Sequence, residues 1–294
     1  MVIILDAHGY RIELQPQSGA TVLSATWTKP GGQVIALLER LDTPDAGLQS
    51  GCFVMVPFVN RIADGRFTFE GRDYSMPVNR PEPAVAIHGF SRDRPWQVMS
   101  ASPDHAILQD TVSSGEHPWR YTVTMHVSIR QKGVRIALTL QNDGTEPLPF
   151  GMGLHPFIPY GPDTTITFAA NGSFPSDHRG LPIAPLARPD GLACGETVPV
   201  QAWRGTDRCY LGWFTQAAMI HWPDRESAMV LSADGVFKHV HLFAPKDRNV
   251  FCVEPVSHFP DAINRPFLGC DAAMAVLAPG ESMSGSMELA AEGL

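Results

Sequence analysis

The sequence lacks the features that mark several large functional classes. Its 294 residues carry 22 Lys and Arg against 30 Asp and Glu, a net charge of −8, and no basic run occurs. Proteins that bind nucleic acid neutralise phosphates with cationic side chains, so we expect no nucleic-acid partner. No stretch approaches the roughly 20 apolar residues of a membrane-spanning helix, so we expect no membrane partner either. The first 14 residues also lack the cationic start of a signal peptide.

Cysteine is scarce, and the common nucleotide and hydrolase motifs are missing. Five scattered cysteines form no CxxC pair that would indicate a metal or redox centre, which favours a reduced, cytoplasmic setting. Neither GxxxxGK[ST] nor GxSxG occurs. Gly151 and Gly153 begin like a dinucleotide-binding loop, but Pro156 stands where the third glycine belongs. Phosphate-loop, serine-hydrolase and dinucleotide chemistry are therefore unsupported.

Glycine and proline, in contrast, are abundant, with 26 residues of each. Proline inside a helix costs about 3 kcal/mol, so this composition excludes long helical bundles and coiled coils. The connectors between short apolar segments are rich in Gly, Pro and Asp, and no βαβ rhythm is visible, which predicts an all-β sandwich or barrel. Length alone suggests two domains. Because no repeat or linker is visible, we expect one domain over residues 1–294.

Alternation of apolar and polar residues predicts particular strands. Residues 121–129 alternate with period 2, and residues 134–140 repeat the pattern after a polar turn, which predicts an antiparallel hairpin. Residues 283–289 alternate again and predict a closing strand. Residues 34–41 fit a helix or a strand equally well. The proline-rich residues 171–206 are typical of a long loop, either functional or inserted.

Three further short strands are expected around Phe67 and Phe69, over residues 236–243 and over residues 249–253. The second of these contains His239 and His241, which lie two apart and so on one face, as the metal-binding jelly rolls of the cupin type require. A cupin has a Glu a few residues beyond the pair, whereas the next Glu here is Glu254. We therefore interpret the two histidines as strand filler or site lining, and expect no metal.

An ordered set of motifs carries a more specific signal. Asn60-Arg61 is followed by a hairpin marked with Gly65 and Gly71, then by Tyr74, Asn79 and His88-Gly89. This run resembles the N-terminal signature of the aldose 1-epimerase (galactose mutarotase) family. Downstream, His155-Pro156-Phe157 resembles the family's His-Pro-aromatic motif, Glu254-Pro255 with Asp261-Ala262 resembles its Glu-Pro motif, and Asp207 before Tyr210 resembles its Asp-aromatic spacing.

The resemblance implies a fold and a set of partners. The expected fold is all-β, a large antiparallel β-sandwich of the galactose mutarotase-like type with an open cleft across one sheet. The expected partner is a small-molecule sugar, bound by a monomer or homodimer, without cofactor or metal.

The chemistry implied by the family needs two proton transfers. Interconversion of α and β anomers opens the hemiacetal, rotates the C1 aldehyde and closes the ring again. An acid must protonate the ring oxygen while a base takes the proton of the C1 hydroxyl, and we expect the two on opposite sides of C1. Unperturbed His and Glu, with pKa values of about 6.5 and 4.3, suit these tasks.

By resemblance, His155 is the acid and Glu254 the base. Asn60, Arg61 and His88 would hydrogen-bond ring hydroxyls or the charge that develops at the ring oxygen, and Asp207 would hold hydroxyls at the far edge of the sugar. The local sequence agrees for the catalytic pair, because His155 and Glu254 stand in apolar surroundings, where a buried polar group needs a partner.

Three rival functions remain at this point. An epimerase of a phosphorylated or sulfonated hexose would need additional cations, for which Arg72, Arg80, Arg92 and Arg94 are candidates. A non-catalytic carbohydrate-binding module is expected to lose His155 or Glu254, yet both are present. A cupin-like metal enzyme would depend on His239 and His241.

Overall fold

Strands dominate the computed structural model, which describes residues 1–41, 51–187 and 193–294. The larger sheet contains ten strands. In spatial order these are β1 (Ile3–Ala7), β2 (Tyr10–Gln15), β3 (Thr21–Thr28), β5 (Cys52–Met55), β15 (Gly153–Pro159), β23 (Val250–Val256), β22 (His239–Phe243), β19 (Asp207–Trp213) and β17 (Ala170–Ser173), with β4 (Val34–Leu38) paired to β3.

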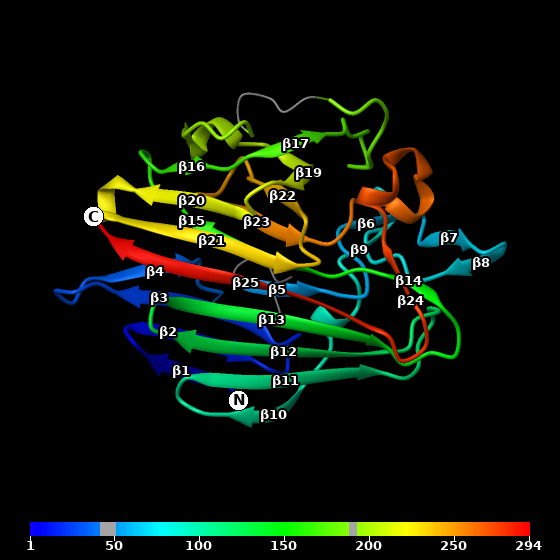
Figure 1. The fold of residues 1–294 in the computed structure, drawn as a ribbon, viewed down its shortest axis with the longest axis horizontal. Coiled ribbons are helices and arrows are strands. Elements are labelled where there is room, and N and C mark those ends of the chain that lie inside the picture. The colour runs from blue at the N-terminus through cyan, green and yellow to red at the C-terminus, as the bar shows by residue number, and fades with distance from the viewer. Residues whose placement is uncertain (42–50, 188–192) are drawn as a thin grey trace.

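The second sheet contains nine strands and lies in front of the first in Figure 1. Its order is β10 (Gln97–Ala101), β11 (His105–Val112), β12 (Tyr121–Arg130), β13 (Gly133–Asn142), β25 (Ser282–Gly293), β21 (Ser227–Gly235), β20 (Ala217–Trp222), β16 (Thr165–Thr167) and β18 (Val198–Pro199). The strand pairs of both large sheets in the described part of the chain are antiparallel, so the predicted all-β, antiparallel sandwich is confirmed.

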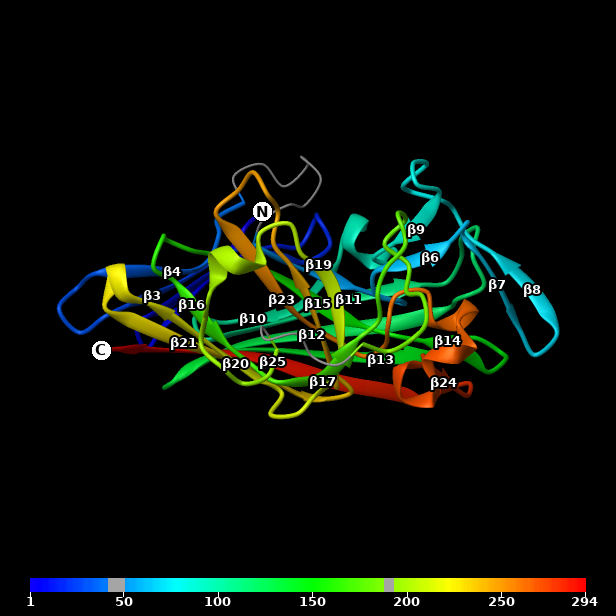
Figure 2. The same cartoon turned by 90° about the horizontal axis from the view of Figure 1, so that it is seen from above.

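Short elements complete the described part of the chain. Three strand pairs stand apart from the large sheets: β6 (Arg61–Ala63) with β9 (Val85–Ile87), β7 (Arg66–Phe69) with β8 (Arg72–Ser75), and β14 (Leu148–Phe150) with β24 (Ala275–Leu277). The β7–β8 hairpin projects from one end of the molecule (Figures 1 and 2). Short 3-10 turns are η1 (Ser91–Asp93), η2 (Val200–Trp203), η3 (Pro223–Arg225), η4 (Ala262–Asn264), η5 (Pro266–Leu268) and η6 (Cys270–Ala272).

Several predictions of local structure are confirmed. β12 and β13 form the expected hairpin, with Tyr121 opposite Asn142, and β25 is the closing strand, placed between β13 and β21. Residues 34–38 form a strand, which resolves the ambiguity of that segment. The strand expected over 236–243 begins only at His239. In the described part of 171–206, regular structure is limited to the end of β17, β18 and η2.

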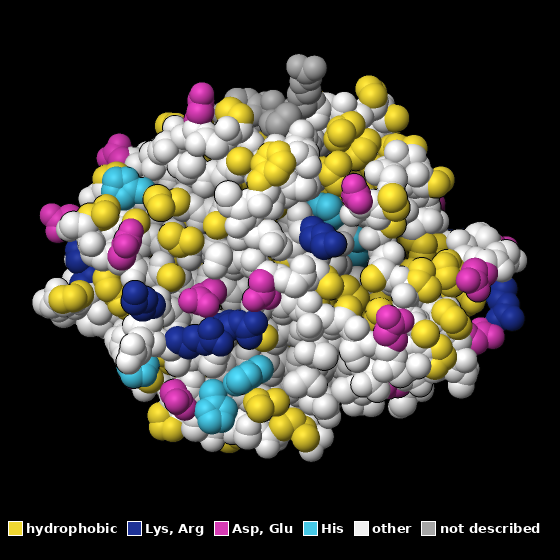
Figure 3. All heavy atoms as spheres, viewed as in Figure 1, with side chains coloured by type: hydrophobic (Ala, Val, Ile, Leu, Met, Phe, Trp, Pro, Cys, Tyr) yellow, Lys and Arg dark blue, Asp and Glu magenta, His cyan; other side chains and the backbone are white. Residues whose placement is uncertain are grey.

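The nine-stranded sheet shows why its strands were easy to predict. Alternate residues of β12, such as Val123 and Met125, are fully buried in the sandwich core, while Thr122 and Thr124 lie on the other face. That outer face carries basic, acidic and histidine side chains next to one another (Figure 3), including the ion pair of Arg135 with Asp234. Because one face of the sheet is exposed to solvent and the other is buried, apolar and polar residues alternate along each strand with a period of 2.

The ten-stranded sheet is covered on both faces at its centre. Every residue of β15 and β23 is buried. Leu154 and Val253 belong to the sandwich core, whereas Phe157 and Cys252 belong to a second apolar cluster on the opposite face. Because successive side chains alternate between faces, residues that share the parity of Phe157 and Cys252 face this second cluster, away from the nine-stranded sheet. Among the described residues, no helix has the length and apolarity needed to cross a membrane.

Candidate active site

Two adjacent central strands bring His155 and Glu254 together. β15 and β23 pair antiparallel, and both side chains leave the face that is turned away from the sandwich core. His155 Nε2 lies 3.3 Å from Glu254 Oε1. Both groups stand on one wall of the cleft, because one face of one sheet presents them, and their expected placement on opposite sides of C1 stays a prediction.

Burial changes the proton affinity of both groups. The two Glu254 oxygens and His155 Nδ1 have no hydrogen-bond partner among the described residues. Burial, with the nearby charge of Asp207, raises the pKa of Glu254 well above its usual range. Burial, with the charges of His241 and Arg92, lowers the pKa of His155 to about 3. Each group is therefore shifted toward its neutral form.

Aromatic rings fix the position of the imidazole. The His155 ring stacks on Phe53 with centroids 4.5 Å apart and on Phe157 at 4.7 Å, and the ring of His88 meets it edge-on at 5.3 Å. His88 is itself held by its backbone N–H, which donates to the carbonyl of Asn60 at 2.8 Å. The proposed acid is therefore held in one orientation before a substrate binds.

The backbone geometry at position 89, the second residue of the His-Gly dipeptide, leaves no room for a side chain. Gly89 has φ 68°, and a Cβ at this position would lie 2.0 Å from the carbonyl oxygen of Val56. Only glycine permits this approach of the two backbones. The close approach places His88 beside the site.

A chain of polar contacts lies beside the pair. Arg61 Nη2 donates to Asp207 Oδ2 at 2.8 Å, and its Nη1 donates to Asn60 Oδ1 at 2.9 Å. His241 Nε2 donates to the other Asp207 oxygen at 2.7 Å. Burial alone would raise the pKa of Asp207, but the hydrogen bond and charge of His241 and the guanidinium of Arg61 hold it well below its usual range. Asp207 is therefore an anionic acceptor for hydroxyl groups.

The two histidines of β22 have different surroundings. His241 lines the same cleft as His155, so it is a site residue that sequence reasoning left unassigned. His239 instead accepts a hydrogen bond from the N–H of Gly212 and donates to the carbonyl of Asp271 at 2.8 Å, beside a separate cavity. The two side chains therefore serve different places along the strand.

All six residues that the resemblance indicated line one cleft, of about 310 Å³. They are Asn60, Arg61, His88, His155, Asp207 and Glu254. Phe157 of the His-Pro-aromatic motif lines the cleft as well, whereas sequence reasoning did not indicate Phe53, Phe243 or Arg248. Arg80 and Arg92 also line the cleft, whereas Arg72 pairs with Glu146 and Arg94 with Asp110 outside it. The size of the cleft is that of a small-molecule site.

Metal-ligating atoms also meet at this site. In the described part of the chain, ligand atoms of His155, Cys252 and Glu254 lie within 4.8 Å of one another. Burial raises the pKa of the Cys252 thiol well above its usual range, and a thiol must ionise to bind a metal.

Comparison with known proteins agrees with the motifs. A sequence model of the family "Aldose 1-epimerase" matches residues 1–290. The chain belongs to the aldose 1-epimerase family. It is 29% identical to the uncharacterized protein YphB of Escherichia coli K12 over the full length of both chains. It is 25% identical to rat galactose mutarotase over a segment that covers 68% of this chain and 58% of that protein.

Solved structures show the same fold. A crystal structure from Escherichia coli K12, described as a candidate aldose 1-epimerase, has a TM-score of 0.88 at 26% identity and covers 100% of this chain and 99% of that one. A galactose mutarotase-like protein from Clostridium acetobutylicum has a TM-score of 0.83 at 20% identity and covers 99% and 95% of the two chains. The galactose mutarotase-like fold implied by the motifs is therefore confirmed.

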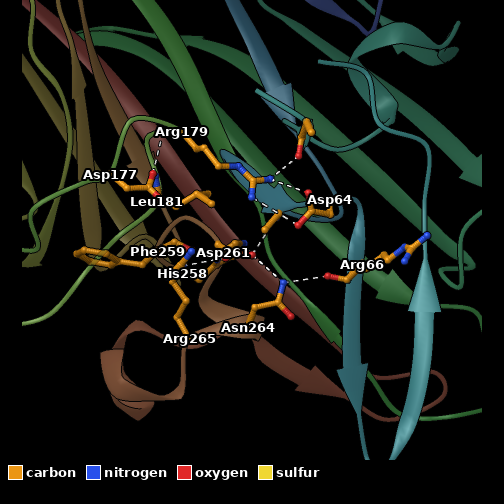
Figure 4. A network of polar contacts seen from close by, with 12 residues as sticks. Asp64, Arg66, Asp177, Arg179, Leu181, His258, Phe259, Asp261, Asn264 and Arg265 are labelled. Carbon is orange, nitrogen blue, oxygen red and sulfur yellow. Dashed lines mark hydrogen bonds and ion pairs between the residues drawn. The ribbon is translucent and has the colours of Figure 1, made fainter. Parts of the chain in front are cut away.

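One motif residue of this aldose 1-epimerase family member supports the cleft without lining it. Asp261 is 1% exposed, and its carboxylate accepts hydrogen bonds from the Ala63 N–H at 3.0 Å, from Asn264 Nδ2 at 2.8 Å and from Arg265 Nε at 2.9 Å. Figure 4 shows this network, with Arg179 and Asp64 paired nearby. Because β6 runs from Arg61 to Ala63, Asp261 fixes the strand that begins with Arg61.

Proposed function

We propose that this protein is an aldose 1-epimerase, which interconverts the α and β anomers of a free aldose by acid/base ring opening and reclosure. One observation carries the proposal. A titratable carboxyl and an imidazole lie 3.3 Å apart in a small polar cleft, without other hydrogen-bond partners among the described residues. Family membership and the fold support the same reaction class.

Ring opening uses the single proton of the pair. When that proton is on His155, the imidazolium donates it to the ring oxygen as the bond from C1 to that oxygen breaks. The Glu254 carboxylate takes the proton of the C1 hydroxyl, and the oxygen's electron pair forms the aldehyde C=O. Because the ring oxygen and the C1 hydroxyl oxygen are both bonded to C1, an acid and a base on one wall reach both.

Reclosure reverses these transfers. After rotation about the bond between C1 and C2, the C5 hydroxyl attacks the other face of the aldehyde. His155 then accepts the proton of that hydroxyl, while Glu254 returns its proton to the new C1 hydroxyl. The pair ends with the one proton it began with, so no cofactor or external acid is consumed.

The polar chain next to the pair would hold the sugar. The Asp207 carboxylate accepts from hydroxyl groups, and Arg61 and Asn60 offer donors in fixed positions because they are bonded to each other and to Asp207. Substrates in such a site are selected by hydroxyl position.

The substitution Glu254→Gln tests the proposed base. Gln has the same shape but accepts no proton at neutral pH, so we expect anomer exchange to fall by about 10²- to 10⁴-fold. Saturation-transfer NMR on a panel of aldoses measures exchange directly, and titration of the sugar's NMR signals reports binding. Glu146→Gln, an exposed carboxylate paired with Arg72, is the matched control and should exchange at the wild-type rate.

Two results would contradict the proposal. Exchange by Glu254→Gln at the wild-type rate would show that Glu254 is not the base. Sugar binding by the wild type without exchange on any aldose would show a carbohydrate-binding module instead of an enzyme.

A further inference from the structure

The cleft concentrates positive charge in an acidic chain. Four arginines line it, and three acidic residues lie among them: Arg61, Arg80, Arg92 and Arg248 with Asp207, Asp247 and Glu254. Arg61 is paired with Asp207 at 2.8 Å, and Glu254 lies 3.3 Å from His155. The described lining residues thus include four arginines against three carboxylates, although the chain as a whole has a net charge of −8.

Arg92 lies over an aromatic ring that stacks on the proposed acid. Its guanidinium sits 5.0 Å over the Phe53 ring, which stacks on His155 at 4.5 Å. Its side chain is only 13% exposed, and its Nε lies 3.3 Å from a carboxylate oxygen of Asp93, which is itself largely exposed. A long cationic side chain is seldom buried to this degree without a function for its charge.

Hydrogen bonds of the buried residue Ser91 hold the turn that carries Arg92. Ser91 is fully buried, and its hydroxyl donates to Asp110 at 2.8 Å, while Trp96 Nε1 donates to the Ser91 carbonyl at 2.9 Å. On the other side, Gly19 has φ 64°, and a Cβ there would lie 2.0 Å from the Arg92 carbonyl oxygen. The backbone of Arg92 is therefore fixed before any ligand binds, which is how binding sites are preorganised.

The strand order indicates which part of a bound sugar lies near the Arg92 guanidinium. In the ten-stranded sheet β5, β15 and β23 are neighbours, so Phe53, His155 and Glu254 follow one another across the cleft wall. In the proposed reaction His155 faces the ring oxygen and Glu254 faces the C1 hydroxyl. The ring oxygen's other neighbour is C5, which therefore lies toward Phe53 and Arg92. The substituent on C5 is C6.

We propose that the substrate is an aldose that carries an anionic group at C6, a carboxylate, a phosphate or a sulfonate, and that Arg92 binds this group. The inference rests on the proposed function, because it uses the roles given there to His155 and Glu254. Arginine suits the task, since its planar fork donates two parallel hydrogen bonds to carboxylate, phosphate or sulfonate oxygens.

A matched set of sugars tests the inference. Glucose, glucuronate, glucose 6-phosphate and 6-deoxy-6-sulfoglucose differ only at C6, and saturation-transfer NMR gives kcat/KM for anomer exchange of each. We expect at least one anionic sugar to exceed glucose by tenfold or more. The three anionic arms distinguish carboxylate, phosphate and sulfonate.

Substitution of Arg92 separates charge recognition from general damage. Arg92→Gln should lower the ratio of anionic to neutral kcat/KM by about ten- to a hundredfold, the usual loss for a hydrogen bond to a charged group. Arg92→Lys, which keeps the charge, should restore part of the ratio. Arg72→Gln, an exposed arginine paired with Glu146, is the control and should leave the ratio unchanged.

The outcomes separate the two proposals. No exchange on any of the four sugars contradicts the enzymatic function itself. Exchange of glucose at least as fast as that of every anionic sugar, or an unchanged ratio in Arg92→Gln, overturns the inference and leaves the mutarotase reaction standing.

Discussion

Glu254 and His155 share one environment and respond to it in opposite directions. Burial raises the pKa of the carboxyl and lowers the pKa of the imidazole to about 3. Their unperturbed values instead describe an ionised Glu and a half-protonated His. Both shifts therefore favour the neutral form of each group.

The raised pKa of Glu254 predicts a pH-dependent effect on stability. The folded protein keeps a proton that the unfolded chain releases above its ordinary value of 4.5. This group therefore contributes most to stability below that value, and the contribution is lost as the pH rises toward the folded-state pKa. The variant Glu254→Gln has no carboxyl at this position, so it does not show this decrease in stability with rising pH. We therefore expect the difference in free energy of unfolding, variant minus wild type, to increase between pH 5 and pH 8.

Urea unfolding at a series of pH values measures this difference. His155 has the opposite sign, because its lowered pKa makes the folded state gain stability from about pH 3 upward, but it is present in both proteins and largely cancels. A difference between variant and wild type that stays constant over the range would contradict the raised pKa of Glu254.

Short connecting elements, more than the long strands, hold the binding residues. Arg61 opens the three-residue strand β6, Arg92 lies on a 3-10 turn, and His88 stands just after β9 with φ 63°. None of these elements has enough internal hydrogen bonds to be stable alone. Each is held by a buried polar residue from elsewhere in the chain, such as Asp261 below β6.

The substitution Asp261→Ala tests this anchoring. It leaves the Ala63 N–H and the Arg265 guanidinium without their shared acceptor (Figure 4), so we expect a loss of about 2–4 kcal/mol in the free energy of unfolding. Because β6 begins with Arg61, KM for the sugar should also rise more than kcat falls. Chemical unfolding and steady-state polarimetry measure the two effects.

A conservative variant and a surface variant serve as controls. Asp261→Asn keeps an acceptor oxygen and should lose less stability than Asp261→Ala. Asp73→Ala, an exposed residue of β8, should change stability by less than about 0.5 kcal/mol. Wild-type stability in Asp261→Ala would show that the network does not hold β6.

At the scale of the whole molecule, the strands that could be predicted from the sequence are those with one face exposed to solvent. The β12–β13 hairpin was visible in the sequence because one of its faces is wet. The central strands β15 and β23 are dry on both faces, so they show no alternation, and His155 and Glu254 could be indicated only through motifs. The pairing of His241 with Asp207 joins residues 34 apart through the order of β22 and β19, which no local pattern encodes.

The separation of the sandwich core from the cleft predicts that stability and catalysis can be changed independently. Leu138 is fully buried in the core, where β13 lies between Met125 of β12 and Gly285 of β25. Leu138→Ala should cost about 2–5 kcal/mol and lower Tm by roughly 5–15 °C. Because the cleft lies on the far face of the other sheet, kcat at 25 °C should equal that of the wild type. Circular dichroism melting and polarimetry at that temperature measure both quantities, and a fall in kcat while the variant is still fully folded would show that the core and the cleft are coupled.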